Sequence, residues 1–402
     1  MRPGAVAALA VVCALLGGST TLLLGRATGW VDEGASDTVF VREATEAADG
    51  AVPVETVAAS PLPGNSFDPA RIYRERAQGV VTIIAFFGGA ASQGSGFVVS
   101  EDGYVLTNSH VITTAGEGSP SDEADAAETV FVEFRDGDRI RARVVGWDVY
   151  DDVGLLKVDP ADHELDPVPL GDSRRVVVGE PVAAIGSPFG QMSSLSVGVV
   201  AATERAIDSL TSEYNLVDAI QTDAPINRGN SGGPMFDARG LVIGINAQIQ
   251  SETGTAEGVG FAIPINSAKR SMEQLIQTGR VRYAWVGVST QSVTPTLAVR
   301  FGLTSQHGAA VQEVVPGSPA EKAGLRAGGE QRAFAGIPFR PGGDVIVSIA
   351  GRPIQDAEDL VRAISERFLP GERVRLGVVR GERRLSVEIR LAERPATPGS
   401  DR

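Results

Sequence analysis

The chain has 402 residues, with 36 Lys and Arg against 50 Asp and Glu, and its formal net charge at pH 7 is -14. This length allows two domains together with some non-globular sequence. The acidic balance argues against a nucleic-acid-binding protein, which would need a basic face, and the single cysteine, Cys13, excludes a disulfide within the chain.

Residues 1–30 are predicted to form a signal anchor or transmembrane segment. No charged residue occurs from Ala5 to Gly25, and about twenty apolar residues are enough to cross the core of a bilayer. The apolar run continues past the length of a signal peptide without a clear cleavage site, which favours an uncleaved anchor. Because Arg2 precedes the run, the rest of the chain is expected on the extracytoplasmic side of the cell membrane as a single-pass protein.

Residues 31–69 are predicted to be a disordered acidic linker. They are rich in Ala, Asp, Glu and Pro, and Arg42 is their only basic residue. Such a segment lacks the apolar residues needed for a core and repels itself, so it would hold the following domain away from the membrane. A second acidic stretch, from Gly116 to Glu128, is interpreted as a surface loop.

Residues 70–280 show the pattern of a mainly β domain. Short β-rich runs recur with turn signals between them, and many short strands with few helices fit a pair of antiparallel barrels. The expected strands are Val80–Phe87, Phe97–Ser100, Val130–Phe134, Ile140–Trp147, Val153–Val158, Val182–Ile185, Val197–Ala201, Ala219–Thr222, Leu241–Ala247 and Gly260–Ile263. Asn266 is expected to cap a helix that ends at Gly279 and closes the second barrel.

One histidine of the three in the chain is a good candidate for a catalytic base. His163 and His307 fall in polar loops, where a histidine is usually solvated, whereas His110 follows an apolar strand-like run. A base of this kind needs an acid that orients its ring. Asp152 stands at the start of a buried apolar strand and is chosen over Asp151, which should point to solvent, and over Asp148.

A matching nucleophile lies in the run Gly229–Pro234, where Ser231 stands between flexible small residues. Glycines in such a turn allow backbone N–H groups to point at one place, as an oxyanion hole requires. The order histidine, aspartate, serine along the chain is the order of chymotrypsin-type triads.

The residues around these three positions resemble the catalytic blocks of the HtrA (Deg) family of trypsin-like serine proteases. The resemblance rests on residues 107–111, 152–156 and 222–234. It implies a trypsin-like double β-barrel, with catalytic His110, Asp152 and Ser231 in the cleft between the barrels. It also implies an oxyanion hole formed by the N–H groups of Gly229 and Ser231, and a homotrimer with contacts near residues 67–76.

The resemblance places the substrate pocket next to the nucleophile. Its walls are expected at Ile226, Asn227, Asn246 and Ala247, and Pro225 stands where a protease that cuts after Arg or Lys has an Asp. A preference for a small or medium apolar side chain is therefore expected. No metal or other cofactor is required, and the three histidines are too scattered for a zinc site.

Residues 281–392 resemble a PDZ domain, an α+β module, and residues 393–402 are expected to be a disordered tail. The run Trp285, Val286, Gly287 and Val288 is similar to the loop that binds peptide carboxylates. An extended peptide C-terminus would add as a strand beside it, with Leu360 from a helix facing the groove. An insertion at residues 329–342 departs from the family pattern, and its relation to the groove is open.

These predictions favour a membrane-anchored serine endopeptidase that cleaves unfolded or damaged extracytoplasmic proteins and binds peptide C-termini at its PDZ domain. Two alternatives stay open. One is a regulatory protease with a single dedicated partner, and the other is a catalytically silent chaperone or adaptor that keeps the fold.

Overall fold

A computed structural model describes residues 67–115, 124–187, 194–212, 214–227, 229–247 and 259–395. The predicted anchor, the linker up to residue 66 and the last seven residues lie outside the described part. Within the ranges given above, no helix is both long enough and apolar enough to cross a membrane.

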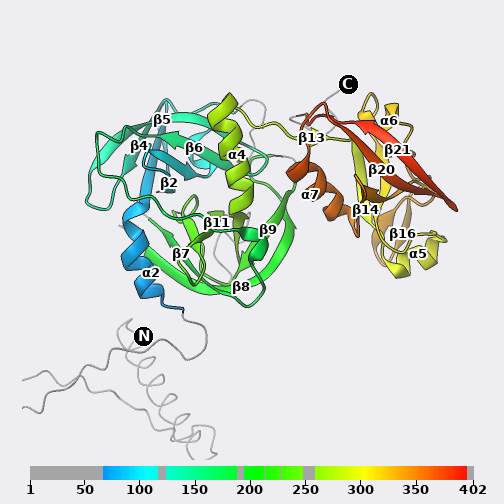
Figure 1. Ribbon diagram of the computed structural model, residues 1–402, viewed down its shortest axis with the longest axis horizontal. Helices are drawn as coiled ribbons and strands as arrows, with labels where there is room; N and C mark the ends of the chain where they lie inside the picture. Colours follow the sequence, from blue (N-terminus) through cyan, green and yellow to red (C-terminus); the bar gives the residue numbers. More distant parts are fainter. Residues whose placement is uncertain are drawn as a thin grey trace, which may run out of the picture. The chain divides into compact units, whose positions relative to one another are not determined.

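The first two-thirds of the described chain forms two closed six-stranded barrels (Figure 1), as the mainly β pattern predicts. Strands follow the order β1-β2-β3-β6-β5-β4 in the first barrel and β10-β11-β12-β9-β8-β7 in the second. The first barrel consists of β1 (Val80–Phe87), β2 (Ala90–Val98), β3 (Tyr104–Thr107), β4 (Thr129–Glu133), β5 (Arg139–Asp148) and β6 (Val153–Lys157). The second consists of β7 (Pro181–Gly186), β8 (Ser194–Ile207), β9 (Leu216–Thr222), β10 (Pro234–Phe236), β11 (Val242–Ala247) and β12 (Gly260–Pro264).

The strand bounds differ from the predictions where polar residues lie in a strand. β2 begins at Ala90, well before the expected start at Phe97. Its first half has small and polar residues, so it shows no apolar strand pattern, but it pairs with β1 and is therefore a strand. β8 extends to Ile207 for the same reason, since it pairs with both β7 and β9. Pairing between strands therefore overrides local apolar pattern at these places.

One hydrophobic cluster spans both barrels, and each barrel also has a cluster of its own. Phe97 and Leu106 from the first barrel and Phe236 and Ile245 from the second belong to one cluster and are fully buried. Their contact holds the two barrels against each other, so the loops at the seam between the barrels are carried by a packed interior.

Two helices close this double barrel. Helix α2 (Pro69–Arg76) begins at the cap Asp68, whose carboxylate accepts a hydrogen bond from the N–H of Arg71 at 2.9 Å, and it buries Ile72. Phe67 also packs against the barrel core. Residues 67–69, which the prediction placed in the linker, therefore belong to the folded domain.

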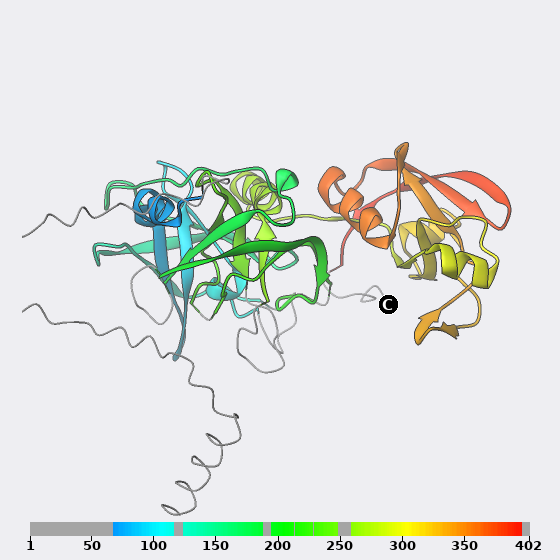
Figure 2. The same ribbon diagram turned by 90° about the horizontal axis from the view of Figure 1, so that it is seen from below.

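Helix α4 (Ile265–Thr278) lies across both barrels and contacts β5, β6, β11 and β12 (Figures 1 and 2). The predicted cap is wrong, because the helix begins after Pro264 and the Asn266 amide donates instead to Asp172 at 2.6 Å. Its end is as predicted, since Gly279 is left-handed at φ 74° and donates to the Leu275 carbonyl.

The remaining residues form the second domain, a sheet in the order β14-β15-β18-β20-β21 with short helices around it. Its elements are β13 (Ala284–Trp285), β14 (Val288–Ser292), α5 (Pro295–Phe301), β15 (Ala309–Val314), α6 (Pro319–Lys322), β16 (Arg332–Phe334), β17 (Ile337–Phe339), β18 (Val345–Ile349), β19 (Arg352–Pro353), α7 (Ala357–Arg367), β20 (Arg373–Arg380), β21 (Arg383–Arg390) and β22 (Ala392–Glu393).

The 329–342 insertion contains a two-stranded hairpin, β16 with β17. Phe339 of this hairpin is buried and stacks on Phe301 of α5, with ring centroids 5.0 Å apart. The insertion therefore packs on the α5 side of the domain.

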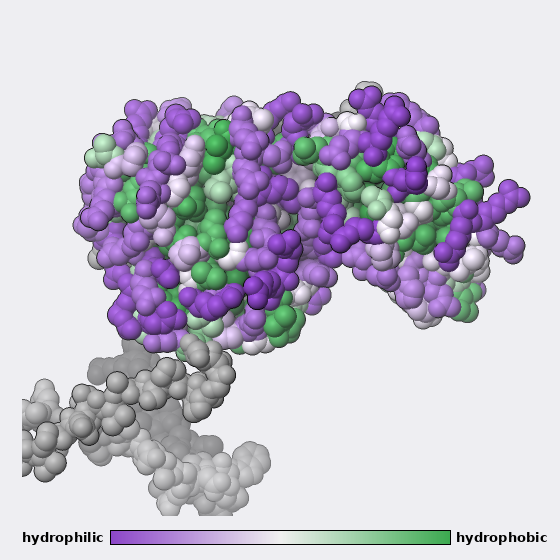
Figure 3. Space-filling view, viewed as in Figure 1, coloured by the Kyte–Doolittle hydropathy of each residue, from purple (hydrophilic) through white to green (hydrophobic). Residues whose placement is uncertain are grey.

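The predicted disordered tail also begins too early. β22 pairs with β13, and the N–H of Arg394 donates to the carbonyl of Tyr283 at 2.8 Å. Residues 393 and 394 are therefore part of the fold. On the face shown in Figure 3, hydrophilic side chains cover most of the surface, in line with the high charge of the chain, and hydrophobic ones reach it between α2 and α4 and on the second domain.

Candidate active site

His110 lies in the first barrel on the short helix α3 (Ser109–Ile112), directly after β3. Its ring Nδ1 is 2.8 Å from Oδ2 of Asp152. The ring is partly exposed, with 19% of its side-chain surface accessible. If Nδ1 donates its proton to Asp152, the other ring nitrogen is left as an acceptor, which is the tautomer that a general base requires.

Asp152 is held in place by several donors from the same short helix. Its Oδ1 accepts the Ser109 hydroxyl at 2.8 Å and the N–H of His110 at 3.0 Å, and its backbone carbonyl accepts the Asn108 amide at 2.9 Å. The residue is buried, and its backbone is left-handed at φ 50°. These contacts leave Oδ2 aimed at the imidazole.

The two neighbouring aspartates do not contact His110. Asp148 instead accepts hydrogen bonds from the hydroxyls of Ser271 and Tyr283. The prediction that Asp151 points to solvent is wrong, because its side chain is buried and pairs with Arg270 at 2.7 Å. The turn brings a cation from α4 to this carboxylate, a contact that no local sequence pattern indicates.

The environment of His110 changes its affinity for protons. Burial lowers the pKa of the imidazole, but the charge of Asp152 and its hydrogen bond together raise it by more, so the pKa lies above the ordinary value of 6.5. A carboxylate that stabilises imidazolium in this way favours the charged form that arises when the ring takes a proton.

The Ser231 loop is held by both barrels. The N–H of Ser95 in β2 donates to the Ser231 carbonyl at 2.8 Å, and the N–H of Gly232 donates to the Asn246 carbonyl of β11 at 2.9 Å. Gly232 has φ 86°, and a Cβ there would lie 2.2 Å from the Ser95 carbonyl oxygen. Only glycine fits this position, so the loop can approach the first barrel closely.

Ser231 is buried, and its Oγ has no hydrogen-bond partner among the described residues. Ser231 Oγ and the His110 ring therefore do not form a hydrogen bond here, and such bonds between catalytic groups often form only once substrate binds. Gly229, beside it, is left-handed at φ 98° and its carbonyl accepts the Ser95 hydroxyl at 2.5 Å.

The residues predicted for the substrate pocket lie around this loop in different settings. Ile226 and Ala247 are buried and Asn227 is exposed. Asn246 is fully buried, and its amide faces the carbonyls of Ile185 and Pro234 at 3.4 and 3.3 Å, so its side chain braces the barrel. Residues 188–193, 228 and 248–258, which flank these positions, lie outside the described chain.

Three residues of the site were missed by sequence reasoning. Asn108 and Ser109 hold Asp152, and Ser95 holds the nucleophile loop. Asn108 and Ser109 directly precede His110, so the polar run before the histidine was a usable signal. Ser95 lies 134 residues before Gly229 of the nucleophile loop, and only the fold brings the two together.

A second concave site lies in the second domain. A hollow of about 270 Å³ between the edge strand β14 and helix α7 is lined by all five predicted residues, Trp285, Val286, Gly287, Val288 and Leu360. Ile364 of α7 also lines it, as do Tyr214, Asn215 and Val217 from the first domain. Residues of the 329–342 insertion do not line this hollow.

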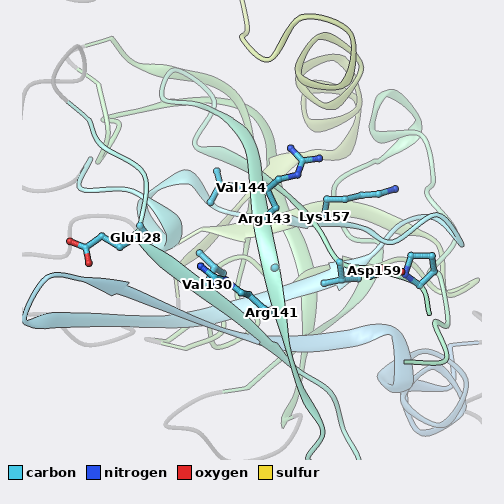
Figure 4. Close-up of a pocket in the computed structure, with 11 residues that line it drawn as sticks. Glu128, Val130, Arg141, Arg143, Val144, Lys157 and Asp159 are labelled. Carbon is cyan, nitrogen blue, oxygen red and sulfur yellow. The ribbon is translucent and has the colours of Figure 1, made fainter. Parts of the chain in front are cut away.

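A larger hollow, of about 760 Å³, opens on the outer side of the first barrel (Figure 4). Arg141 and Arg143 of β5 and Lys157 of β6 contribute its positive charge, and Arg143 pairs directly opposite Lys157. Glu128 points away from them in this view. None of His110, Asp152 and Ser231 lines this hollow, so it is separate from the candidate triad.

Two parts of the chain match known protein families. Residues 94–245 match the trypsin-like peptidase domain, and residues 285–391 match the PDZ domain. These matches correspond to the double barrel and to the second domain. The predicted fold class, a trypsin-like double barrel followed by a PDZ domain, is confirmed.

Individual relatives extend over both domains. The chain is 41% identical over 307 residues to a probable periplasmic serine endoprotease DegP-like from Hahella chejuensis, a match that covers 76% of this chain and 58% of the relative. A protein of the same description from Brucella suis is 38% identical, with 77% and 54% covered. The chain thus spans little more than half the length of these curated relatives.

Solved structures give a fuller match. The HtrA-type protease AlgW, solved with a tripeptide, is 33% identical to this chain, with a TM-score of 0.67. The match covers 82% of this chain and 98% of AlgW. A serine endoprotease from Yersinia pestis is 28% identical, with a TM-score of 0.58, and the match covers 83% of this chain and all of that one.

Proposed function

Because the chain belongs to the HtrA family of serine proteases, we propose that it is a serine endopeptidase that hydrolyses peptide bonds of unfolded or damaged extracytoplasmic proteins. The observation that carries this proposal is the 2.8 Å contact between His110 and Asp152 beside a glycine-rich loop that carries Ser231. A silent scaffold has no chemical need for this arrangement.

In the proposed reaction, Ser231 Oγ attacks the substrate carbonyl carbon and its proton passes to Nε2 of His110. Asp152 holds the ring by Nδ1 and stabilises the imidazolium. His110 then donates the proton to the leaving amine, and the acyl group remains on Ser231 until water attacks with His110 again as base. The N–H groups of Gly229 and Ser231 are proposed to bind the oxyanion, an interaction generally worth about 3 to 4 kcal/mol per donor.

Hydrolysis of unfolded casein by the full chain tests this proposal directly. We expect cleavage by the wild-type chain and none by Ser231→Ala, which keeps the fold but lacks the nucleophile. Activity in both proteins would contradict the assignment of Ser231. If neither cleaves casein, even with C-terminal peptides added, the dedicated-partner protease or the chaperone becomes the better reading.

We further propose that the hollow between β14 and α7 binds the C-terminus of an extended peptide. Three observations support it: β14 is an edge strand, Gly287 has φ 84°, and the side chains lining the hollow are mostly apolar. Fluorescence anisotropy with a labelled peptide that ends in an apolar residue should show binding. The same peptide with an amidated C-terminus should bind much more weakly, because backbone N–H groups recognise the carboxylate; equal binding would contradict the proposed mode.

The extracytoplasmic location rests on relatives described as periplasmic. An uncleaved N-terminal anchor is proposed from the apolar run after Arg2. Carbonate extraction of membranes together with N-terminal sequencing tests it, and a soluble chain that starts after residue 25 would contradict it.

A homotrimer with contacts around residues 67–76 is proposed from the family resemblance. Light scattering on the purified chain tests this assembly. A monomeric mass at working concentration would contradict it.

A further inference from the structure

The turn that carries the triad acid is tied to α4 and to the segment after it by a buried polar cluster. The centre of this cluster is Asp148, which is 2% exposed. Its Oδ1 accepts the N–H of Tyr150 at 3.0 Å and that of Asp151 at 3.4 Å. Its Oδ2 accepts the hydroxyls of Ser271 and Tyr283, each at 2.6 Å. One oxygen therefore holds the turn, and the other is held from outside it.

A second tie runs parallel to the first. Asp151 pairs with Arg270 of α4 at 2.7 Å, and the Arg270 guanidinium lies 5.5 Å from the centre of the Tyr283 ring. Arg394 also lies over that ring, 4.9 Å from its centre. Two cations therefore contact the Tyr283 ring, and its hydroxyl donates to Asp148.

The charges in the cluster keep the Tyr283 hydroxyl as the donor and the Asp148 carboxylate as the acceptor of their hydrogen bond. Burial and the nearby Asp151 raise the pKa of Asp148 to about 6, so its carboxylate is ionised at neutral pH. Burial and the Asp148 charge raise the pKa of Tyr283 well above 10, so its phenol stays a donor. Tyr150, Tyr214, Arg394 and Glu393 are further titratable groups near the cluster.

The turn needs this support because its backbone is strained. Asp152 has φ 50°, a left-handed conformation that a non-glycine residue keeps only where its surroundings hold it. From the inside, Asn108, Ser109 and the N–H of His110 hold this residue. From the other side, α4 holds the turn at Asp148 through Ser271 and at Asp151 through Arg270, and Tyr283 holds it at Asp148.

Tyr283 does not belong to the barrels. It follows α4 by five residues and directly precedes β13, the first strand of the second domain. The last residues of that domain return to the same place, since the Tyr150 hydroxyl donates to the carbonyl of Pro395 at 3.1 Å. Both ends of the second domain therefore meet the turn that carries Asp152.

We propose that Tyr283 is a positioning residue for the triad acid, through which the start of the second domain sets the orientation of Asp152 toward His110. The effect on catalysis rests on the proposed function. The effect on the His110–Asp152 contact does not, and it can be measured without any turnover.

The decisive measurement is NMR titration of the imidazoles in Ser231→Ala protein, with and without Tyr283→Phe. The chain has only three histidines, so each signal can be assigned by substitution, and His163 and His307 serve as internal controls. We expect the pKa of His110 to fall toward 6.5 in the Tyr283→Phe protein, because Asp152 stabilises imidazolium less well when its turn relaxes. The other two pKa values should not move. An unchanged His110 pKa in a folded Tyr283→Phe protein would overturn the proposal.

Kinetics then separate positioning from simple loss of folded protein. Tyr283→Phe should lower kcat by up to about 100-fold, the usual scale for a misplaced catalytic group, with little change in KM. The matched control is Tyr104→Phe. Tyr104 lies on β3, and its ring contacts the Lys157 ammonium of β6. Removing its hydroxyl should leave kcat unchanged. A fall in activity that only follows the fraction of folded protein would contradict the proposal.

A double-mutant cycle identifies the route. Asp148→Asn alone and Asp148→Asn combined with Tyr283→Phe should have the same kcat, because the hydroxyl acts through this carboxylate. Additive losses would show that Tyr283 does not act through Asp148 and would contradict the proposal. A shifted His110 pKa in a chain that cleaves nothing would leave the positioning role intact and reject the proposed function.

Discussion

At the scale of single residues, the candidate site depends most on Asp152. One carboxylate oxygen accepts a hydroxyl and a backbone N–H, which leaves the other free for the imidazole. Its neighbours Asp148 and Asp151 have the same charge but bond away from the site. The position of the side chain, and not its chemistry, distinguishes these three aspartates.

Replacing Asp152 by Asn should lower kcat by about 10,000-fold, the loss seen when the orienting acid of such a triad is changed to an amide. An Asn of the same size can keep the turn but can present its NH2 group to Nδ1 and thereby favour the wrong ring tautomer. Casein hydrolysis measures the loss, and circular dichroism checks the fold. A folded Asp152→Asn protein with near wild-type kcat would contradict the role proposed for this residue.

The raised pKa of His110 predicts opposite pH dependences for activity and stability. Because a general base must be neutral, kcat/KM should increase with pH through an ionisation above 6.5. A histidine with a pKa raised by folding binds protons more tightly in the native state. Its contribution to the free energy of unfolding is therefore complete below about pH 6.5 and is lost as the pH rises through the folded pKa.

Two measurements between about pH 5 and pH 9 check this pair of trends. One is the kcat/KM of the wild-type chain, and the other is the free energy of unfolding of the Ser231→Ala protein. Asp152→Asn is the control. It should move the acid limb of its residual activity to lower pH, since the anion that raises the His110 pKa is gone. An acid limb at the ordinary histidine value in the wild-type chain would contradict the prediction.

At the scale of elements, the Ser231 loop is a joint between the barrels. β2 holds it from one side through Ser95, and β11 holds it from the other through Asn246. The close approach depends on Gly232, where a side chain would meet the Ser95 carbonyl at 2.2 Å and the Thr107 hydroxyl at 2.5 Å. The loop can therefore be tested by a single methyl group.

Gly232→Ala should lower the free energy of unfolding by about 2 to 5 kcal/mol, from left-handed strain together with overpacking, and should abolish hydrolysis. Gly279→Ala is the matched control. This glycine also has a positive φ, 74°, but a Cβ there meets nothing within 4 Å, so only about 1 to 2 kcal/mol of strain is expected. Chemical denaturation measures both, and equal losses would mean that the close contact does not matter.

At the scale of the whole molecule, the described residues from Phe67 onward belong to one compact unit that contains both domains. Arg362 of α7 pairs with Asp218 of β9 at 2.5 Å, and only 21% and 15% of the two side chains is exposed. Burial raises the pKa of Asp218 to about 6 although Arg362 acts to lower it. This pair connects the helix beside the second-domain hollow to the second barrel.

Arg362→Ala should reduce the free energy of unfolding by about 2 to 3 kcal/mol at neutral pH, because a mostly buried carboxylate loses its charged partner. The loss should be smaller at a pH below the pKa of Asp218, where the protonated group needs no cation. Arg373→Ala is the control: its pair with Glu388 is exposed at 71% and 57% and should cost less than about 1 kcal/mol. Denaturation at pH values above and below 6 measures both variants, and an equal loss at the two would contradict the role of Asp218.

The sequence by itself determined the fold class and the candidate residues His110, Asp152 and Ser231. Local patterns were sufficient there, because a strand's apolar period and a glycine-rich turn are properties of neighbouring residues. The five residues predicted to bind a peptide C-terminus came instead from the resemblance to PDZ domains, and all five line the second-domain hollow.

The tertiary structure alone decided which charges are paired and which residues meet across elements. Asp151 reads as solvent-exposed until α4 brings Arg270 to it. Tyr214 and Val217 join the second-domain hollow, and Arg394 joins the cluster around Tyr283, only because the chain folds back on itself. Contacts between residues this far apart depend on packing and buried charge, and neither leaves a periodic trace in the local sequence.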